Sequence, residues 1–311
     1  NGQDELIGGD GDDSFLFDQT ADAESGDSVD GGDGDDVIDI DGDNSPITID
    51  LTGVQISNVE SFNLGDTGGA TTNTVVFTDA QLNGESTVFN IDENVNAGAN
   101  SVIRVQANED TTDLRDLELN RFENADDVTI ENEDFVDIAG DADATNIFGT
   151  SADDRISGGG DADNLTGGGG QNEFLYQTGD ASQFTFTDSA PAGGAIQLDD
   201  DDTFSGLEVI NDFSTGAAGD GGDILNLGAA NGSIGADGTT TGTLEADEFI
   251  ATQGTFAGGT FTVGSTTGDT DTLVTFDGDA SGTVEQEAVV LVGVDLNNVG
   301  ANFAGGDVTF S

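Results

Sequence analysis

Large apolar residues recur at intervals of nine in two parts of the chain, separated by stretches of glycine and aspartate. Each stands in a short run of β-forming residues, and successive side chains of a strand point to opposite faces. The spacing therefore predicts short strands that each turn one large side chain inward. These residues are Leu6, Phe15, Val29 and Ile38 in the first part, which has an insertion at 18–26, and Ile138, Ile147, Ile156, Leu165 and Phe174 in the second.

A nonapeptide surrounds these apolar positions. Residues 8–16 have the sequence GGDGDDSFL and residues 31–39 the sequence GGDGDDVID, both matching G-G-x-G-x-D-x-U-x with U a large apolar residue. The glycines permit a tight turn with φ > 0 and let backbone carbonyls approach an ion. The aspartate in the sixth place adds a hard anionic oxygen. The unit predicts a calcium site together with a turn of a parallel β-solenoid.

Through these nonapeptides the sequence resembles the RTX, or hemolysin-type calcium-binding, family of secreted bacterial proteins. The resemblance implies that two nonapeptides form one turn of a β-roll and that several Ca²⁺ ions lie between loops stacked on the same side. It also implies that sixth-place side chains bind the ions and that loop carbonyls complete the coordination shells. The implied ligands are Asp4, Asp13, Asp27 and Asp36 in the first array, Asp154, Asp163 and Asn172 in the second, and carbonyls near Gly8, Gly31, Gly158 and Gly167.

The second array departs from the pattern. Asp161 replaces the glycine in the fourth place, and Asn172 keeps a carbonyl ligand in the sixth place but lacks the charge, which predicts a weaker site. Thr145 occupies the sixth place before Ile147, so that turn is expected to hold no ion. Arg155, next to two aspartates, is either a built-in counter-charge for them or an ordinary surface arginine.

The chain divides into four regions on this pattern: a first array (1–44), degenerate β-solenoid rungs (45–137), a second array (138–175) and a β-rich C-terminal region (176–311). Strands are predicted at 46–51, 59–64, 74–78, 87–91, 101–105 and 127–130. Residues 79–82 and 114–119 could each form a helical turn. The segments SNVESFN (57–63) and SGLEVIN (205–211) share S-x-[V/L]-E-x-[F/I]-N, which favours further rungs of the same architecture over chance similarity. The fold class predicted is all-β.

The C-terminal region is similar to the region that follows the repeats in serralysin-type proteins. The similarity lies in stretches such as LEVINDFSTG (207–216) and AVVLVGVDLNNV (288–299). It implies a cap over the open end of the solenoid, whose strand edge would otherwise invite aggregation. The last residues, GGDVTFS, are similar to uncleaved signals for type I secretion, which implies export from a Gram-negative-type cell to the surface or the extracellular space.

Composition excludes several partners and activities. The formal net charge is −60, with 64 acidic residues and four basic ones, so nucleic acid is not an expected partner. No apolar run has the ~20 residues of a membrane-spanning helix. Histidine, cysteine and lysine are absent, which excludes histidine-dependent triads, the H-E-x-x-H zinc motif and cysteine or lysine nucleophiles. A carboxylate pair could hydrolyse glycosides, but no pair stands out, and we expect no enzymatic activity.

The expected function is structural. We expect a secreted calcium-binding protein that assembles with copies of itself into a surface layer, an extracellular fibre or a matrix. The first alternative is a calcium-dependent folding and secretion module of a larger RTX enzyme, toxin or adhesin, and a third hypothesis is an adhesin for a host or polysaccharide surface. Gly2, Asp4 and Leu6 occupy the fourth, sixth and eighth places of a repeat that lacks its first residues, so a longer polypeptide is expected.

Overall fold

The computed structural model describes residues 3–41, 46–65, 72–82, 87–92, 100–120, 134–176, 185–187, 203–216, 221–227, 249–264, 269–277, 286–296, 301–304 and 307–310. Within these ranges the protein is nearly all β. The N-terminal strands are β1 (Glu5–Asp10), β2 (Ser14–Phe17), β3 (Ser28–Asp33), β4 (Val37–Asp41), β5 (Thr48–Asp50), β6 (Gln55–Ser57), β7 (Ser61–Gly65), β8 (Thr72–Thr78), β9 (Val88–Asp92), β10 (Asn100–Ala107), β11 (Thr111–Asp113), β12 (Glu118–Asn120), β13 (Phe135–Gly140), β14 (Asn146–Phe148), β15 (Asp154–Ser157), β16 (Asn164–Thr166) and β17 (Glu173–Leu175).

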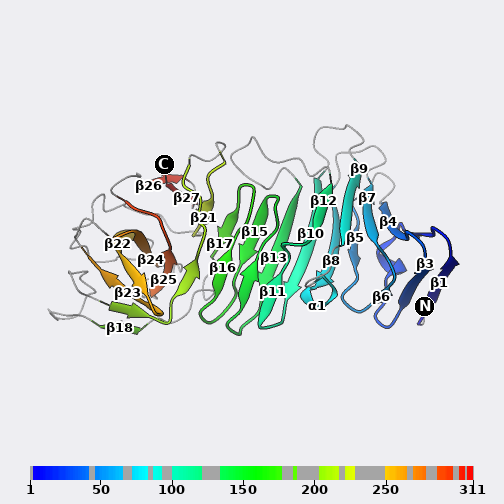
Figure 1. The fold of residues 1–311 in the computed structure, drawn as a ribbon, viewed down its shortest axis with the longest axis horizontal. Coiled ribbons are helices and arrows are strands. Elements are labelled where there is room, and N and C mark those ends of the chain that lie inside the picture. The colour runs from blue at the N-terminus through cyan, green and yellow to red at the C-terminus, as the bar shows by residue number, and fades with distance from the viewer. Residues whose placement is uncertain are drawn as a thin grey trace.

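The C-terminal strands are β18 (Thr185–Thr187), β19 (Thr203–Ser205), β20 (Glu208–Ile210), β21 (Ile224–Asn226), β22 (Phe249–Ala257), β23 (Thr260–Val263), β24 (Asp271–Asp277), β25 (Gln286–Leu291), β26 (Ala301–Ala304) and β27 (Asp307–Phe310). A short helix, α1 (Asp79–Leu82), and a 3₁₀ turn at Thr20–Asp22 accompany them. The strands lie side by side in an elongated stack, with β1 near one end and β22–β25 near the other (Figure 1).

Consecutive strands of the second array alternate between two sheets. β13, β15 and β17 are neighbours in a nine-stranded sheet, whereas β14 and β16 are neighbours in a ten-stranded one. All these pairs are parallel, with Ile138 opposite Ile156, Ile156 opposite Phe174, and Ile147 opposite Leu165. Paired residues are therefore eighteen apart, and those nine apart come from opposite sheets. All five side chains of this ladder are buried, which confirms that they point inward.

The first array has the same parallel pairing with a longer step. Leu6 lies opposite Val29 and Phe15 opposite Ile38, so the partners are 23 residues apart. The additional residues include the 3₁₀ turn, which falls in the insertion seen in the sequence. Val29 and Ile38 are buried as predicted, but Leu6 is 41% exposed. Its strand β1 is at the edge of a three-stranded sheet, so only one neighbour covers it.

One apolar core runs along the stack between the sheets. Phe62 and Phe89 come from the five-stranded sheet that contains β7 and β9, and Phe77 comes from β8 of the nine-stranded sheet. The rings of Phe62 and Phe77 meet edge to face with centroids 5.0 Å apart, and those of Phe62 and Phe89 stack at 5.2 Å. Each such ring removed from water contributes about 1.5–3 kcal/mol to stability. The ladder residues of both arrays other than Leu6 belong to or pack against this core.

Antiparallel strands follow the parallel stack at its C-terminal end. β25 pairs in parallel with β20 but antiparallel with β24, and β24, β22, β23, β19 and β18 continue antiparallel. The faces of β25 divide its side chains between two cores: Val289 and Leu291 join the long core, while Val290 packs in a second cluster with Phe204 and Phe261.

The strand predictions for 46–51, 59–64, 74–78, 87–91 and 101–105 are confirmed as β5, β7, β8, β9 and β10, and 127–130 lies outside the described residues. The helical turn predicted at 79–82 is confirmed as α1. The one predicted at 114–119 is wrong: a single turn, closed by the N–H of Leu117 donating to the carbonyl of Leu114, leads directly into β12. The buried leucines three apart have helical spacing, but they bracket one turn.

Candidate metal-binding loops

The sixth-place side chains form a hydrogen-bonded series that links one turn to the next. Each accepts a hydrogen bond from the backbone N–H of the sixth-place residue in the preceding turn of the same sheet. The donor–acceptor pairs are Asp4 N to Asp27 Oδ1 (2.9 Å), Asp13 N to Asp36 Oδ1 (2.8 Å), Thr145 N to Asp163 Oδ1 (2.7 Å) and Asp154 N to Asn172 Oδ1 (3.2 Å). The N–H groups of Asp4 and Glu24 accordingly hold the pKa of Asp27 below its usual value. One oxygen of each side chain is thus used to align the loops.

In the two complete nonapeptides, the second carboxylate oxygen of the sixth-place aspartate faces a space above the first glycine. Asp27 differs, because its Oδ2 accepts the N–H of Glu24 at 2.8 Å. A Cβ placed on Gly8 would lie 2.5 Å from Asp13 Oδ2 and close to the carbonyl oxygen of Gly31. A Cβ on Gly31 would meet Asp36 Oδ2 in the same way. Asp13 Oδ2 and Asp36 Oδ2 are both buried without a hydrogen-bond partner among the described residues. Only glycine leaves room here, and the oxygens that converge on the space are all acceptors.

The second array repeats this arrangement in part. Asp163 Oδ2 lies against the Cβ position of Gly158. Asn172 instead turns its Nδ2 to the Cβ position of Gly167, because its Oδ1 accepts the N–H of Asp154, so the carbonyl ligand expected from Asn172 does not face this space. Asp154 differs, because Thr150 donates both its N–H (2.8 Å) and its hydroxyl (3.0 Å) to this carboxylate. The structure therefore brings Asp4 next to Asp27, Asp13 next to Asp36, and Asp154 next to Asn172. It places Asp163 on the other sheet, stacked on Thr145.

The oxygen atoms of these loops suit a cation that takes many oxygen ligands. Among the described residues, no three or more histidine, cysteine, aspartate or glutamate side chains gather around one point. The loops of Asp13 and Asp36 instead each present one carboxylate oxygen together with a backbone carbonyl. Calcium accepts six to eight such oxygens at about 2.3–2.6 Å in loose geometry, whereas magnesium requires a stricter octahedron. The orphaned oxygens of Asp13 and Asp36 and the glycine cradles therefore fit calcium, which the resemblance implies.

Sequence reasoning missed several acids that take the sixth place in other turns. Asp36 N donates to Glu60 Oε2 (2.7 Å), Ser101 N to Asp134 Oδ1 (2.6 Å), and Asn172 N to Asp223 Oδ1 (2.8 Å). None of the three acceptors, Glu60, Asp134 and Asp223, belongs to a complete nonapeptide. Each nevertheless stands two positions before a buried apolar residue, which is the spacing of the sixth and eighth places. That spacing, without the glycines, is the signal that could have identified them.

Two of the buried carboxyls have raised pKa values in the absence of a cation. Burial raises the pKa of Asp223 to about 7, although the N–H groups of Ser214 and Asn172 oppose the shift. Burial also raises the pKa of Asp154 well above its usual range. Transfer of a charged carboxylate out of water is costly unless it is paired. Protons or cations therefore stabilise this part of the protein.

This shift predicts a pH dependence for the calcium-free protein. Between about pH 4 and pH 7 the folded state holds a proton on Asp223 that the unfolded chain has lost, so stability is greatest below about pH 4 and falls as the pH rises to about 7. The loss amounts to about 4 kcal/mol for this group. Asp223→Asn, which stays neutral, should match the wild type near pH 4 and retain more β-sheet circular dichroism at pH 7 in chelator. Parallel curves for the two proteins across this range would contradict the assignment.

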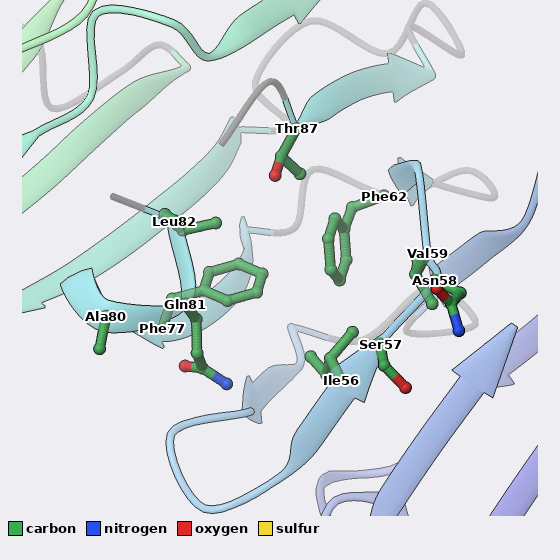
Figure 2. A pocket seen from close by; sticks show the side chains of 10 residues that line it. All are labelled: Ile56, Ser57, Asn58, Val59, Phe62, Phe77, Ala80, Gln81, Leu82 and Thr87. Carbon is green, nitrogen blue, oxygen red and sulfur yellow. The ribbon is translucent and has the colours of Figure 1, made fainter. Parts of the chain in front are cut away.

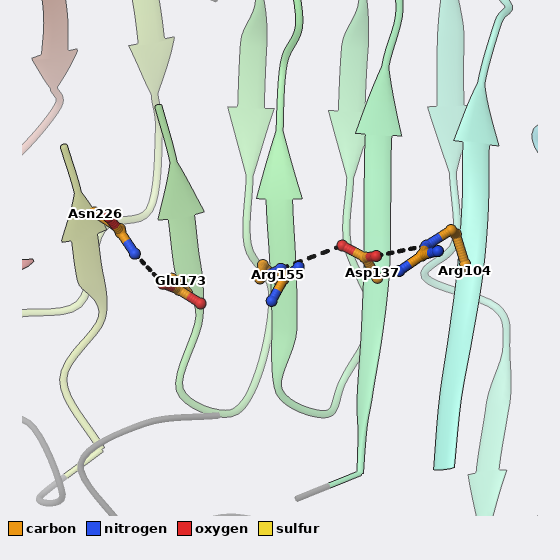
Figure 3. Close-up of polar contacts among 5 residues, drawn as sticks. All are labelled: Arg104, Asp137, Arg155, Glu173 and Asn226. Atoms are coloured by element: carbon orange, nitrogen blue, oxygen red, sulfur yellow. Dashed lines mark hydrogen bonds and ion pairs between the residues drawn. The ribbon is translucent and has the colours of Figure 1, made fainter. Parts of the chain in front are cut away.

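Two arginines pair with one aspartate on the outer face of a sheet. Arg104 Nε (2.7 Å) and Arg155 Nε (3.3 Å) both contact Asp137, in a row across β10, β13 and β15 on the outer face of the nine-stranded sheet (Figure 3). In the same view Asn226 Nδ2 donates to Glu173 Oε1 at 2.6 Å. The ion pair of Arg155 is therefore with Asp137 and not with its sequence neighbour Asp154. Adjacent residues of a strand point to opposite faces, which turns Arg155 outward.

A cavity of about 370 Å³ lies beside α1 and the turn before β7 (Figure 2). Its lining combines apolar side chains of the core with amides and hydroxyls at the rim, and none of these residues is titratable. The residues are Ile56, Ser57, Asn58, Val59, Phe62, Phe77, Ala80, Gln81, Leu82 and Thr87. The Gln81 amide is already bonded to Thr78 and to the carbonyls of Leu51 and Val54. The cavity thus offers no acid–base pair for catalysis.

A scan against models of protein families finds no match for the chain, and no curated protein matches it either. The resemblance to the RTX family therefore rests on the nonapeptides and on the residues quoted for it. The described part of the chain contains no helix with the length and apolar character needed to cross a bilayer.

Proposed function

We propose that the chain is a secreted calcium-binding structural protein, built as a parallel β-solenoid whose turns are held together by calcium and which assembles with copies of itself outside the cell. The observation that carries this proposal is the convergence of acceptor oxygens above Gly8 and Gly31, where Asp13 Oδ2 and Asp36 Oδ2 are buried and no described residue donates to them. Buried acceptors that meet at one point are costly unless a cation or a donor joins them. Calcium fits this need, and two stacked loops of the first array, at Gly8 and Gly31, offer such a place.

The charge of the protein supports a role for calcium in assembly as well as in folding. With a net charge of −60, copies of the chain repel one another unless cations neutralise or bridge their surfaces. Many carboxylates lie on exposed positions of the loops, among them Asp10, Asp12, Asp33 and Asp35. Divalent ions between such surfaces would turn repulsion into attraction. A layer, a fibre or a matrix are the forms of assembly that this chemistry supports.

Assembly is tested by imaging and sedimenting the calcium-loaded protein before and after chelation. We expect particles much larger than the 31.5 kDa chain in millimolar calcium, and their dispersal when a chelator is added. Sodium chloride at matched ionic strength serves as the control, because simple screening should not replace bridging ions. Assemblies that persist after exhaustive chelation, or a protein that remains monomeric at every calcium concentration, would contradict self-assembly.

A second candidate is a calcium-dependent folding module within a larger secreted enzyme, toxin or adhesin. It is favoured by the apolar side chains exposed on β1 and β2, where Leu6, Ile7 and Leu16 are 41%, 63% and 60% exposed. Such side chains on an edge strand suit a surface that further polypeptide covers. A monomer that still requires calcium to fold would favour this candidate over the assembling protein.

A further inference from the structure

Each array is followed by a turn that is shorter than a nonapeptide and carries glutamate instead of aspartate. These turns belong to the two segments with the shared pattern S-x-[V/L]-E-x-[F/I]-N. Three residues, 58–60, stand between Ser57 and Ser61, whereas six residues, 31–36, stand between their paired partners Asp30 and Val37. Phe62 then stacks on Ile38, and Ile210 stacks on Leu165 in the second array. Glu60 and Glu208 thus take the sixth place above the last aspartate of each array.

The short turn after the first array directs oxygens at the same space as the loop below it. Asn58 has a left-handed backbone (φ 51°), and its side-chain amide donates to Asp30 Oδ1 at 2.7 Å, which holds this conformation. Its carbonyl oxygen lies above Gly31, as does Asp36 Oδ2. Asp36 is fully buried and its Oδ2 has no hydrogen-bond partner among the described residues. Glu60 Oε2 reaches the same loop, because it accepts the N–H of Asp36.

The turn after the second array has the same form. Gly206, in the position of Asn58, also has a left-handed backbone (φ 73°). Glu208 Oε1 lies 2.7 Å from the Cβ position of Gly158, and Asp163 Oδ2 lies against the same point. Glu208 and Asp163 are only 1% and 2% exposed. Two carboxylates from successive turns thus converge above one glycine in the interior.

We propose that Glu60 and Glu208 are calcium ligands that close the two arrays, each completing a last site with the aspartate below it: Asp36, Asn58 carbonyl and Glu60 in one, Asp163 and Glu208 in the other. This inference rests on the calcium binding proposed above. A glutamate has one more methylene than aspartate, so Glu60 can span the gap that the turn before β7, shorter by three residues, leaves. The last loop of each array then binds an ion on both of its sides instead of one.

The chain carries a spectroscopic reporter at the second of these sites. Tyr176 is its one tyrosine, and the chain contains no tryptophan. Its hydroxyl donates to Glu208 Oε1 at 2.9 Å, so the ring is anchored at the proposed site. Terbium(III) replaces calcium at oxygen sites, and its emission is sensitised by a nearby aromatic ring with a steep dependence on distance. Terbium at the Glu208 site should therefore emit when Tyr176 is excited.

The experiment combines terbium emission with a count of bound calcium by equilibrium dialysis, on the full chain. Glu208→Gln should weaken tyrosine-sensitised terbium binding at least tenfold and remove one calcium from the count. Glu60→Gln should remove one calcium and leave the sensitised emission unchanged. Tyr176→Phe should abolish the emission and keep the full count, which controls for the fold. Glu118→Gln, an exposed glutamate of β12, is the matched control and should change neither readout.

The outcomes distinguish failure of this inference from failure of the proposed calcium binding on which it rests. If the wild type binds calcium and terbium but both glutamine variants keep the full count and affinity, the glutamates are not ligands and the inference fails alone. If the wild type binds neither ion, calcium binding fails and the inference fails with it. If Glu208→Gln does not fold, Tyr176→Phe and Glu60→Gln still decide: unchanged counts in both, with emission lost only in Tyr176→Phe, would refute the Glu60 site.

Discussion

Removing calcium from the purified protein should abolish most of its β-sheet circular-dichroism signal at neutral pH. If each site has a Kd of about 0.1 mM and free calcium is about 10 mM, each ion adds about 2.7 kcal/mol to the free energy of unfolding. Three or four such sites together equal the typical stability of a whole domain, about 5–15 kcal/mol. Without the ions, the orphaned carboxylate oxygens of the loops repel one another and the carbonyls beside them. Stacking the turns would then cost more free energy than it recovers.

The measurement is a calcium titration of the chelated protein, followed by circular dichroism and by thermal unfolding. We expect a steep, cooperative recovery of the spectrum, since each turn folds on its neighbour. Magnesium at the same concentration is the control and should restore much less, because its octahedral shell fits the loops poorly. A protein that keeps its full spectrum and its melting temperature in excess EGTA would refute calcium-dependent folding.

Gly31→Ala should destabilise the calcium-loaded protein by about 5 kcal/mol. The added methyl group would lie against the carbonyl oxygen of Asn58 and against Asp36 Oδ2, closer than real Cβ contacts come. Forcing atoms into a packed interior costs about 1–3 kcal/mol, and losing one bound ion removes about 2.7 kcal/mol more. The substitution should also raise the calcium concentration at the midpoint of folding.

Gly65→Ala is the matched control for Gly31→Ala. A Cβ on Gly65 would have its nearest neighbour, the carbonyl oxygen of Ile40, at an ordinary 3.7 Å, and the residue ends a regular strand. This variant should match the wild type within about 0.5 kcal/mol in chemical unfolding. Equal stability of the two variants would mean that the space above Gly31 is not held by the oxygens around it.

The periodic part of the fold could be predicted from the sequence because each turn repeats the same local chemistry. The nine-residue spacing identified the inward side chains of the second array, from Ile138 to Phe174, and the structure buries every one. Glycines in the loops marked tight turns. The backbone keeps the left-handed conformation of the turn even at Asp161, which replaces a glycine and has φ 60°. Where local sequence and packing favour the same structure, a short sequence pattern is enough to predict the strands and their buried side chains.

The contacts that cross from one turn to another could not be predicted in the same way. Asp223 follows Asn172 by 51 residues, so nothing local shows that its carboxylate accepts the Asn172 N–H. Arg155 illustrates the converse: its nearest acids in sequence are Asp153 and Asp154, but strand geometry turns it to Asp137 on the neighbouring strand. The hydrogen-bond or ion-pair partner of each acid depends on the register of strands that are distant in sequence. That register follows from the packing of the whole core.

The passage of the chain from one sheet to the other at every nonapeptide has a consequence for how such a protein can change in length. Deleting a single nonapeptide from the second array would exchange the sheets of all later strands: β16 would have to take the place of β15, beside β13 instead of β14. Deleting two adjacent nonapeptides returns the chain to the same sheet and the same side of the loops. Growth and shortening during evolution should therefore add or remove nonapeptides in pairs. An odd number should be tolerated only where an irregular segment returns the later strands to their original sheets.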